Sequence, residues 1–246
     1  MNRLLIVDIE SYIYKSITAG KTLHQDNIHK NIFYEGYDIN KCILYIKDNL
    51  DRFIDSIPNA VSCELVIGDK HNFRKDINPE YKSNRQAKPP IYEKILDEVN
   101  RQFKLISLPN LEADDTCRIL YEDETFHPNL EKIIVSIDKD FYSVPCAFYR
   151  DLPGKELVFT DYDTAQYHLF KQIIMGDATD NYSGIPGYGE AKAKKFLEFS
   201  RTEQDVIKLF EDNGLTKDDY FRNKYMAQII SKSQYNFKTG LVNYAG

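Results

Sequence analysis

The sequence lacks the features that mark a secreted, disulfide-bonded or membrane-spanning protein. Its 246 residues include only four cysteines, Cys42, Cys63, Cys117 and Cys146, and none of their spacings matches a metal-binding or redox motif. No apolar stretch approaches the roughly 20 residues that a membrane-spanning helix needs. The short apolar run at the N-terminus ends at Asp8. We therefore expect reduced core cysteines, a cytoplasmic location and no membrane partner.

The chain also lacks an excess of positive charge. Its formal net charge is −6, which taken alone argues against a nucleic-acid partner. Setting aside nine acids that we expect to gather around metal ions brings the charge of the remainder to +3. Residues 70–88 carry six Lys or Arg against two acids. Because the local field matters more than the total charge, this distribution favours a nucleic-acid partner.

Three short apolar runs predict the centre of the fold. They cover residues 3–8, 64–69 and 132–138, and each ends in an aspartate. Continuous β-branched runs of this length suit parallel strands that are buried on both faces. Helical spacing of apolar residues over 39–57 and 91–103 separates the runs. Alternating strands and helices predict an α/β fold with a mostly parallel sheet; shorter strands are expected at 147–150 and 157–160.

The pattern changes after about residue 163. A helix is expected at 166–175, followed by a turn-rich stretch over 176–189 that contains four glycines. A basic helix should follow, from residue 190 to about 199. Further helices are expected near 203–212 and 217–233. We therefore divide the chain into residues 1–163, an α/β core with a polar excursion at about 70–108, and residues 164–246, a helical part packed on that core.

Nine acids lie at the ends of predicted elements. Asp8, Asp69 and Asp138 each end a strand, and the carboxyl ends of parallel strands meet at one edge of a sheet. Asp140 shares a face with Asp138 if the chain stays extended. Pairs three residues apart share a helix face. The full set is Asp8, Asp69, Glu112, Asp114, Asp115, Asp138, Asp140, Asp177 and Asp180.

Such a cluster predicts a metal centre. Repulsion among converging carboxylates would raise several of their pKa values, and a bound cation would remove that repulsion. Hard carboxylate oxygens without His or Cys suit two Mg²⁺ ions, for which Mn²⁺ can substitute. A single aspartate at a strand end is more often a cap or turn residue. Three such aspartates together with Glu-Ala-Asp-Asp and Asp-Lys-Asp favour the metal interpretation.

These motifs resemble those of the 5′ nucleases. The order is the strand ending in Asp8, then Gly68-Asp69, Glu112-Ala-Asp-Asp, Ser136-Ile-Asp-Lys-Asp and Gly176-Asp-x-x-Asp-Asn. That family includes bacteriophage 5′ exonucleases, cellular flap endonucleases and the 5′ nuclease domain of bacterial DNA polymerase I. The resemblance covers residues 3 to about 200. It implies a three-layer domain of the PIN-like kind, a helical arch at about 70–108 and a C-terminal helix-hairpin-helix region.

The resemblance also implies roles for individual residues. Positions matching Asp69, Glu112, Asp114 and Asp115 serve mainly one metal, and those matching Asp138, Asp140, Asp177 and Asp180 mainly the other. Asp8 supports the site, partly through water. Lys82 and Arg85, in a Tyr-Lys-x-x-Arg segment at the base of the arch, would contact the scissile phosphate and stabilise charge in the transition state.

Further residues are expected to hold DNA. Gly184, Gly187 and Gly189 resemble the hairpin of a helix-hairpin-helix turn, which in the family grips duplex DNA, often around a K⁺ ion. Two positions depart from the family pattern: Ala191 stands where a lysine is usual, and Lys15 replaces an arginine and so lacks its bidentate fork. The other expected DNA contacts are Arg74, Tyr81, which could stack on an unpaired base, Lys192, Lys194 and Lys195.

The resemblance implies a monomeric nuclease that cuts DNA at 5′ ends, nicks and 5′ flap junctions. The size and motif spelling resemble phage enzymes and suggest a role in phage DNA replication in the host cytoplasm. RNA–DNA hybrids stay open as substrates. Two alternatives are kept: a metal-dependent ribonuclease of the PIN-like class, and a protein that binds branched DNA without cutting it. The ribonucleases are usually shorter and lack the glycine hairpin, and a non-catalytic binder should have lost several of the nine acids.

Overall fold

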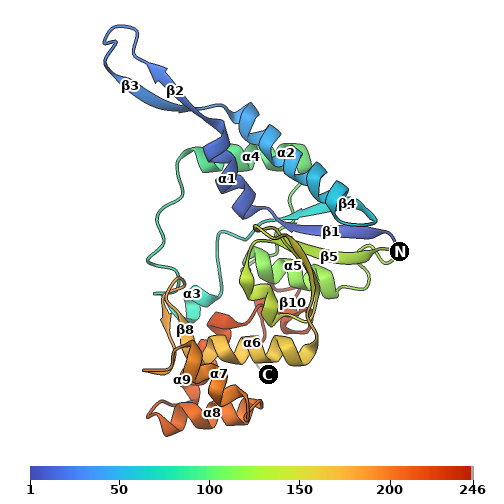
Figure 1. Ribbon diagram of the computed structural model, residues 1–246, viewed down its shortest axis with the longest axis vertical. Helices are drawn as coiled ribbons and strands as arrows, with labels where there is room; N and C mark the ends of the chain where they lie inside the picture. Colours follow the sequence, from blue (N-terminus) through green and yellow to red (C-terminus); the bar gives the residue numbers. More distant parts are fainter. Residues whose placement is uncertain (245–246) are drawn as a thin grey trace.

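The computed structural model describes residues 1–244 and has a five-stranded sheet at its centre (Figure 1). Four strands are parallel neighbours, and the last is antiparallel to the strand beside it. This confirms the predicted α/β class and mostly parallel sheet. In spatial order the strands are β4 (Ala60–Val66), β1 (Arg3–Asp8), β5 (Glu131–Ser136), β6 (Ala147–Arg150) and β7 (Glu156–Phe159).

Helices cover both faces of the sheet. Side chains alternate along β1, so that Leu5 and Val7 pack toward one face and Leu4 and Ile6 toward the other. The first face is covered by α1 (Glu10–Gly20), α2 (Ile39–Ser56) and α4 (Ile91–Phe103). The second face is covered by α5 (Ala113–Glu122) and the 3₁₀ helix η1 (Lys139–Ser143). The molecule therefore has the three layers that the sequence predicts.

The predicted arch at 70–108 is wrong in extent. Helix α4 belongs to the core layer, where Tyr92, Ile95 and Val99 are fully buried with residues of α1 and α2. Its apolar side chains recur at helical spacing, and such a face must be covered. Within residues 70–108, the part that leaves the layers is the stretch before α4, which carries the short helix α3 (Arg74–Ile77).

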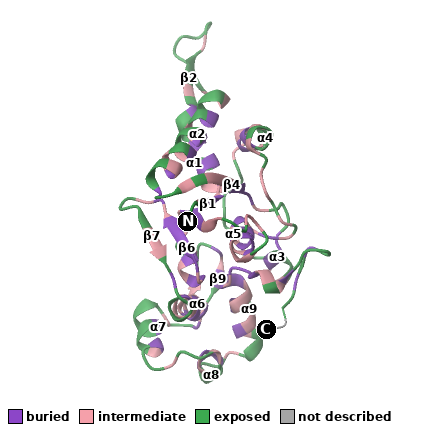
Figure 2. Ribbon diagram, turned by 90° about the vertical axis from the view of Figure 1, so that its right-hand side faces the viewer, coloured by how far each residue is buried: buried purple, intermediate pink, exposed green. Residues whose placement is uncertain are grey.

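A hairpin that the sequence analysis missed projects from the core (Figure 1). It consists of β2 (Lys21–Gln25) and β3 (Phe33–Tyr37), which connect α1 to α2. Most of its residues are exposed on both faces (Figure 2). Without a buried face the strands show little hydrophobic alternation, and the connecting residues 26–32 contain no glycine or proline.

The C-terminal helices surround a hydrophobic cluster of their own. They are α6 (Tyr162–Met175), α7 (Glu190–Leu197), α8 (Glu203–Asp212) and α9 (Lys217–Ala227). Helix α9 ends six residues earlier than predicted. Between α6 and α7 lies a small hairpin of β8 (Gly176–Asp177) and β9 (Tyr182–Ser183). After α9 come η2 (Lys232–Gln234), β10 (Tyr235–Asn236) and β11 (Leu241–Val242).

The composition predicted reduced core cysteines and no membrane-spanning helix. The four cysteines are free, and three of them are buried. None of the helices within residues 1–244 is both long and apolar enough to cross a membrane.

Candidate active site

The carboxyl ends of β1 and β5 place two acids side by side. Asp8 closes β1, and its carboxylate accepts a hydrogen bond from the Ser136 hydroxyl at the end of β5 (3.2 Å). The same hydroxyl accepts one from the backbone N–H of Asp138 (3.1 Å). Burial, followed by the nearby carboxylates of Glu10 and Asp138, raises the pKa of Asp8 to about 7.

Asp140 reaches the same region by a different backbone path from the one predicted. Asp138 caps η1 by accepting the N–H of Asp140 (2.9 Å), so the chain turns instead of staying extended. Gln172 of α6 donates to the Asp140 carboxylate (3.2 Å). Burial and the charge of Asp138 raise the pKa of Asp140 to about 7. The two acids therefore stay close through a 3₁₀ turn.

Helix α5 contributes a further acid with a perturbed pKa. Burial, Asp115 and Glu112 raise the pKa of Asp114 well above its usual range. Burial raises the pKa of the Cys117 thiol, and the carboxylates of Asp8 and Asp114 raise it further. Within the described chain no Lys, Arg or His forms an ion pair with Asp8, Asp114, Asp138 or Asp140. We call these four residues the acidic wall.

A cavity of about 100 Å³ lies against the acidic wall. It brings together acids from three separate segments of the chain, at the carboxyl edge of the sheet. Its aspartates are Asp114, Asp138, Asp140, Asp177 and Asp180, and its other polar side chains include Arg74, Tyr81, Lys82, Arg85 and Lys139. Five of the nine predicted acids therefore line one cavity, and Asp8 adjoins it through Asp138.

Lys82 and Arg85, from the stretch between β4 and α4, pair with acids on the opposite side of the cavity. The Lys82 ammonium lies 2.5 Å from Glu112 and 3.6 Å from Asp180, and Arg85 lies 2.7 Å from Asp180. Burial raises the pKa of Glu112, but Lys82 and Arg74 outweigh it and lower the value to about 2. We call Glu112, Asp115 and Asp180, each of which contacts a Lys or Arg, the paired wall.

The backbone holds Lys82 in place. Its φ of 56° is in the left-handed region that side chains other than glycine rarely adopt. Its N–H donates to the Asp180 carbonyl (2.9 Å). Strained conformations of this kind persist where the surrounding structure imposes them, often at functional sites.

Tyr81 is wrongly predicted as a stacking platform, because its side chain is only 2% exposed. Its hydroxyl lies 3.0 Å from a Glu112 oxygen and 3.1 Å from an Asp180 oxygen, so it contacts two acids of the paired wall.

Two other predicted positions are corrected by the structure. Arg74, an expected DNA contact, is 1% exposed. It makes a bidentate pair with Asp115 at 2.7 and 2.8 Å. Asp115 itself is fully buried, so both groups are held inside the protein. Their burial follows from pairing, which is what allows charged groups to leave water.

Asp69 lies apart from the cavity. It follows β4 by three residues, in an exposed loop. Its carboxylate accepts the N–H groups of Lys70 and Asn110, both at 2.8 Å. The expectation that strand-end aspartates converge therefore holds for Asp8 and Asp138 and fails for Asp69, because these backbone contacts hold its carboxylate in the loop.

The donor chemistry of the site fits a hard divalent cation. The acidic wall offers oxygen donors only, and burial raises the pKa of Asp8, Asp114 and Asp140, which form no ion pair within the described residues. Across residues 1–244, however, no group of three or more His, Cys, Asp or Glu side chains is arranged to enclose a metal ion. Ligation would therefore require side-chain rotations within the wall.

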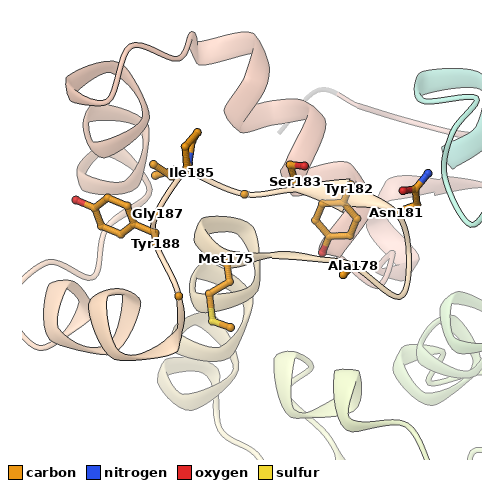
Figure 3. Close-up of a pocket in the computed structure, with 11 residues that line it drawn as sticks. Met175, Ala178, Asn181, Tyr182, Ser183, Ile185, Gly187 and Tyr188 are labelled. Carbon is orange, nitrogen blue, oxygen red and sulfur yellow. The ribbon is translucent and has the colours of Figure 1, made fainter.

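The glycine-rich turn forms a second candidate site. It borders a hollow of about 560 Å³ (Figure 3). Gly187 has a φ of 75°, and a Cβ on Gly184 would lie 2.2 Å from the Ile174 carbonyl, so both positions require glycine. Gly189 caps α7 without a side chain and leaves the first N–H groups of the helix without a side-chain acceptor. Such a helix start suits a phosphate.

The remaining basic residues vary in their placement. Lys192 is exposed on α7, and its ammonium is 3.7 Å from where a Cβ of Gly187 would lie. Lys194 is paired with Glu190 at 2.9 Å, and Lys195 is exposed. Lys15 is half-buried against the ring of Tyr12.

Sequence reasoning missed two residues that support the acids. Ser136 bridges Asp8 and Asp138, and its position two residues before Asp138 in the strand was a usable signal, because both then share one face. Gln172 reaches Asp140 from α6, which is 32 residues away in sequence. No local pattern marks that contact.

Comparison with known proteins places the chain in a family. Residues 3–150 match the family model described as the 5′-3′ exonuclease, N-terminal resolvase-like domain. The exonuclease of Escherichia phage T7 is 27% identical, with 95% of this chain and 90% of that protein covered. The exodeoxyribonuclease of Enterobacteria phage T3 is 29% identical, with 87% and 73% covered.

A solved structure has the same fold. It is a bacteriophage T5 flap endonuclease in a pseudo-enzyme–product complex with DNA and metal ions. The TM-score is 0.66 at 15% identity, with 93% of this chain and 89% of that chain covered.

Proposed function

The chain belongs to the 5′-3′ exonuclease family and is a nuclease of that family, and we propose that it hydrolyses DNA phosphodiesters at 5′ ends and 5′ flap junctions with two divalent metal ions. Mg²⁺ is the proposed ion, with Mn²⁺ as a substitute. The T7 and T3 relatives are named as exonucleases of phages, which supports a role in phage DNA replication. RNA–DNA hybrids are a secondary substrate class to be tested.

One observation carries the proposal. A single cavity has acids without protein counter-ions on one side and cations on the other. The acidic wall suits divalent ions, and Lys82 and Arg85 suit a phosphate. A site that brings both together fits a phosphodiester, whose hydrolysis builds up negative charge.

The acidic wall and Asp177 are the side chains proposed to hold the ions. Divalent ions bound there would supply Lewis acidity toward water and the phosphate oxygens. Gln172 and Ser136 orient Asp140 and Asp8 through the hydrogen bonds described above. Such supporting bonds fix the direction of a ligating carboxylate.

Lys82 and Arg85 are proposed to contact the scissile phosphate. Both are bound to carboxylates of the paired wall. A phosphate in the cavity would compete with these carboxylates for the ammonium and the guanidinium. An ammonium that meets the phosphate as charge develops lowers the barrier more than it improves binding.

The glycine turn is proposed to hold the intact duplex. The positive φ of Gly187 and the lack of a side chain on Gly184 allow the backbone to approach phosphates. Lys192 stands beside this backbone. A K⁺ ion at the turn and a monomeric state complete the proposal.

The proposal is tested with a 5′-labelled flap duplex. Wild-type protein should release labelled product in Mg²⁺ and none in EDTA, and product length separates exonucleolytic from flap cleavage. Asp140→Asn, which removes one charge of the acidic wall, is the matched control. Binding of the flap without product in Mg²⁺ or Mn²⁺ would contradict catalysis and favour a branched-DNA-binding protein. Cleavage of single-stranded RNA alone would favour the ribonuclease alternative.

A further inference from the structure

Asp115 is saturated with hydrogen bonds. One oxygen accepts from Arg74 (2.8 Å) and the backbone N–H of Ile230 (2.7 Å). The other accepts from Arg74 (2.7 Å) and the backbone N–H of Glu112 (3.2 Å). A carboxylate has about four lone-pair positions, so none is left for a metal ion. Asp115 therefore joins elements of the protein to one another.

Asp115 connects the start of α5 to the segment after α9. We call this segment, residues 228–242, the C-terminal segment. The Arg74 guanidinium also donates to the Gln228 carbonyl (2.7 Å). Next to this contact, Arg118 of α5 donates to the Ile229 carbonyl (2.6 Å). Further along, the N–H of Lys232 donates to Glu122 (2.8 Å). The contacted residues of α5 recur at helical spacing, so the segment lies along one face of the helix.

The same segment reaches the loop that holds Asp69. The Tyr235 hydroxyl donates to the Pro109 carbonyl (3.1 Å), and the Asn110 side chain donates to the Gly240 carbonyl (2.7 Å). The backbone N–H of Asn110 in turn holds the Asp69 carboxylate. Tyr235 packs in a buried cluster with Phe73, the residue before Arg74.

We propose that the C-terminal segment is a brace that positions Asp114 at the start of α5 for metal binding, and that Asp115 and Arg74 are positioning residues acting through it. This rests on the proposed metal-dependent function. The segment lies beyond the residues that match the family model, which end at 150. It contains no Asp or Glu, so any effect of the segment on metal binding must act through residues that it holds.

The test compares two adjacent acids of α5. Mn²⁺ binding is titrated by calorimetry without DNA, and hydrogen exchange of residues 228–236 is followed by mass spectrometry. Asp115→Asn should keep the number of ions bound, weaken their affinity about tenfold and speed exchange in that stretch. Asp114→Asn should lose an ion, or at least about a hundredfold in affinity, with exchange unchanged. The brace is overturned if Asp115→Asn loses an ion while exchange stays slow, or changes neither quantity.

A gentler variant covers the case in which Asp115→Asn does not fold. Tyr235→Phe removes one hydrogen bond and keeps the buried ring. It should speed exchange in the C-terminal segment and weaken Mn²⁺ affinity about threefold, since one hydrogen bond contributes modestly. Faster exchange with unchanged affinity would refute the brace, as would unchanged exchange. Wild-type protein that binds no Mn²⁺ and cuts no flap would instead refute the proposed function, whatever the exchange rates of the variants.

Discussion

The acidic wall and the paired wall carry the same kind of charge but differ in what balances it. Glu112 is held by Lys82 and Arg74, which lower its pKa to about 2. Asp140 has no cation beside it in an ion pair among the described residues, and burial with Asp138 raises its pKa to about 7. The difference teaches that a cluster of acids identifies a cation site only where the protein supplies no cation of its own.

The largest effect should come from removing a charge of the acidic wall. Asp140→Asn should abolish flap cleavage in Mg²⁺ and, in EDTA, should stabilise the protein, because it removes a buried negative charge that lies beside Asp138. A shift of about three pKa units corresponds to at most about 4 kcal/mol in the free energy of unfolding. Denaturant unfolding in EDTA at pH 8 measures it.

The matched control is Asp180→Asn in the paired wall. It leaves Arg85 and Tyr81 without their charged partner, so stability in EDTA should fall, by about 1–3 kcal/mol. If both variants changed stability in the same direction, the two walls would not differ as described.

Lys82→Ala breaks the paired wall and should slow the cleavage step. Losing one electrostatic donor to the transition state typically costs about 10²–10³ in rate. Single-turnover cleavage at saturating enzyme measures the step, while flap affinity should change little. A normal cleavage step with weaker and less salt-sensitive binding would make Lys82 an ordinary phosphate contact.

In metal-free protein, the contributions of the two walls to the free energy of unfolding should change with pH in opposite directions. Asp8 and Asp140 have a pKa of about 7 in the folded state and 3.8 in the unfolded state. The folded state therefore binds protons more tightly, and the stability that this provides is lost as the pH rises from about 4 to 7. Glu112 has a pKa of about 2 against 4.5, so its contribution is lost as the pH falls through that range. The free energy of unfolding in EDTA, measured from pH 3 to pH 8, should therefore show a maximum near pH 4. A stability that rises steadily to pH 8 would contradict this.

The smallest effect should come from the glycine turn, which lies outside both walls. Gly187→Val places a β-branched residue at a φ of 75°, a strain of about 1–3 kcal/mol. Affinity for a flap duplex should fall about tenfold, and affinity for single-stranded DNA should fall less. An equal loss for both would indicate general misfolding.

The sequence predicted the layers and all five acids that line the cavity, because buried strands and helical faces leave a direct hydrophobic pattern at whose ends the acids stand. The prediction failed for residues whose position depends on contacts between distant parts of the chain. The charges of Arg74 and Asp115 look solvent-exposed in the sequence, yet they pair in the interior across 41 residues. The β2–β3 hairpin has no buried face and so left no pattern. Asp69 was misplaced because its carboxylate is held by the backbone N–H of Asn110, which is 41 residues away in sequence.

The most direct test is to count the protons released when a divalent ion binds. Calorimetric titration of Mn²⁺ at pH 6, in buffers of different ionisation enthalpy, gives this number. Since Asp8 and Asp140 carry protons at this pH in metal-free protein, wild type should release at least about one proton per protein, and Asp140→Asn about one fewer. Binding that releases no protons, or the same number from both proteins, would contradict the assignment of the ions to the acidic wall.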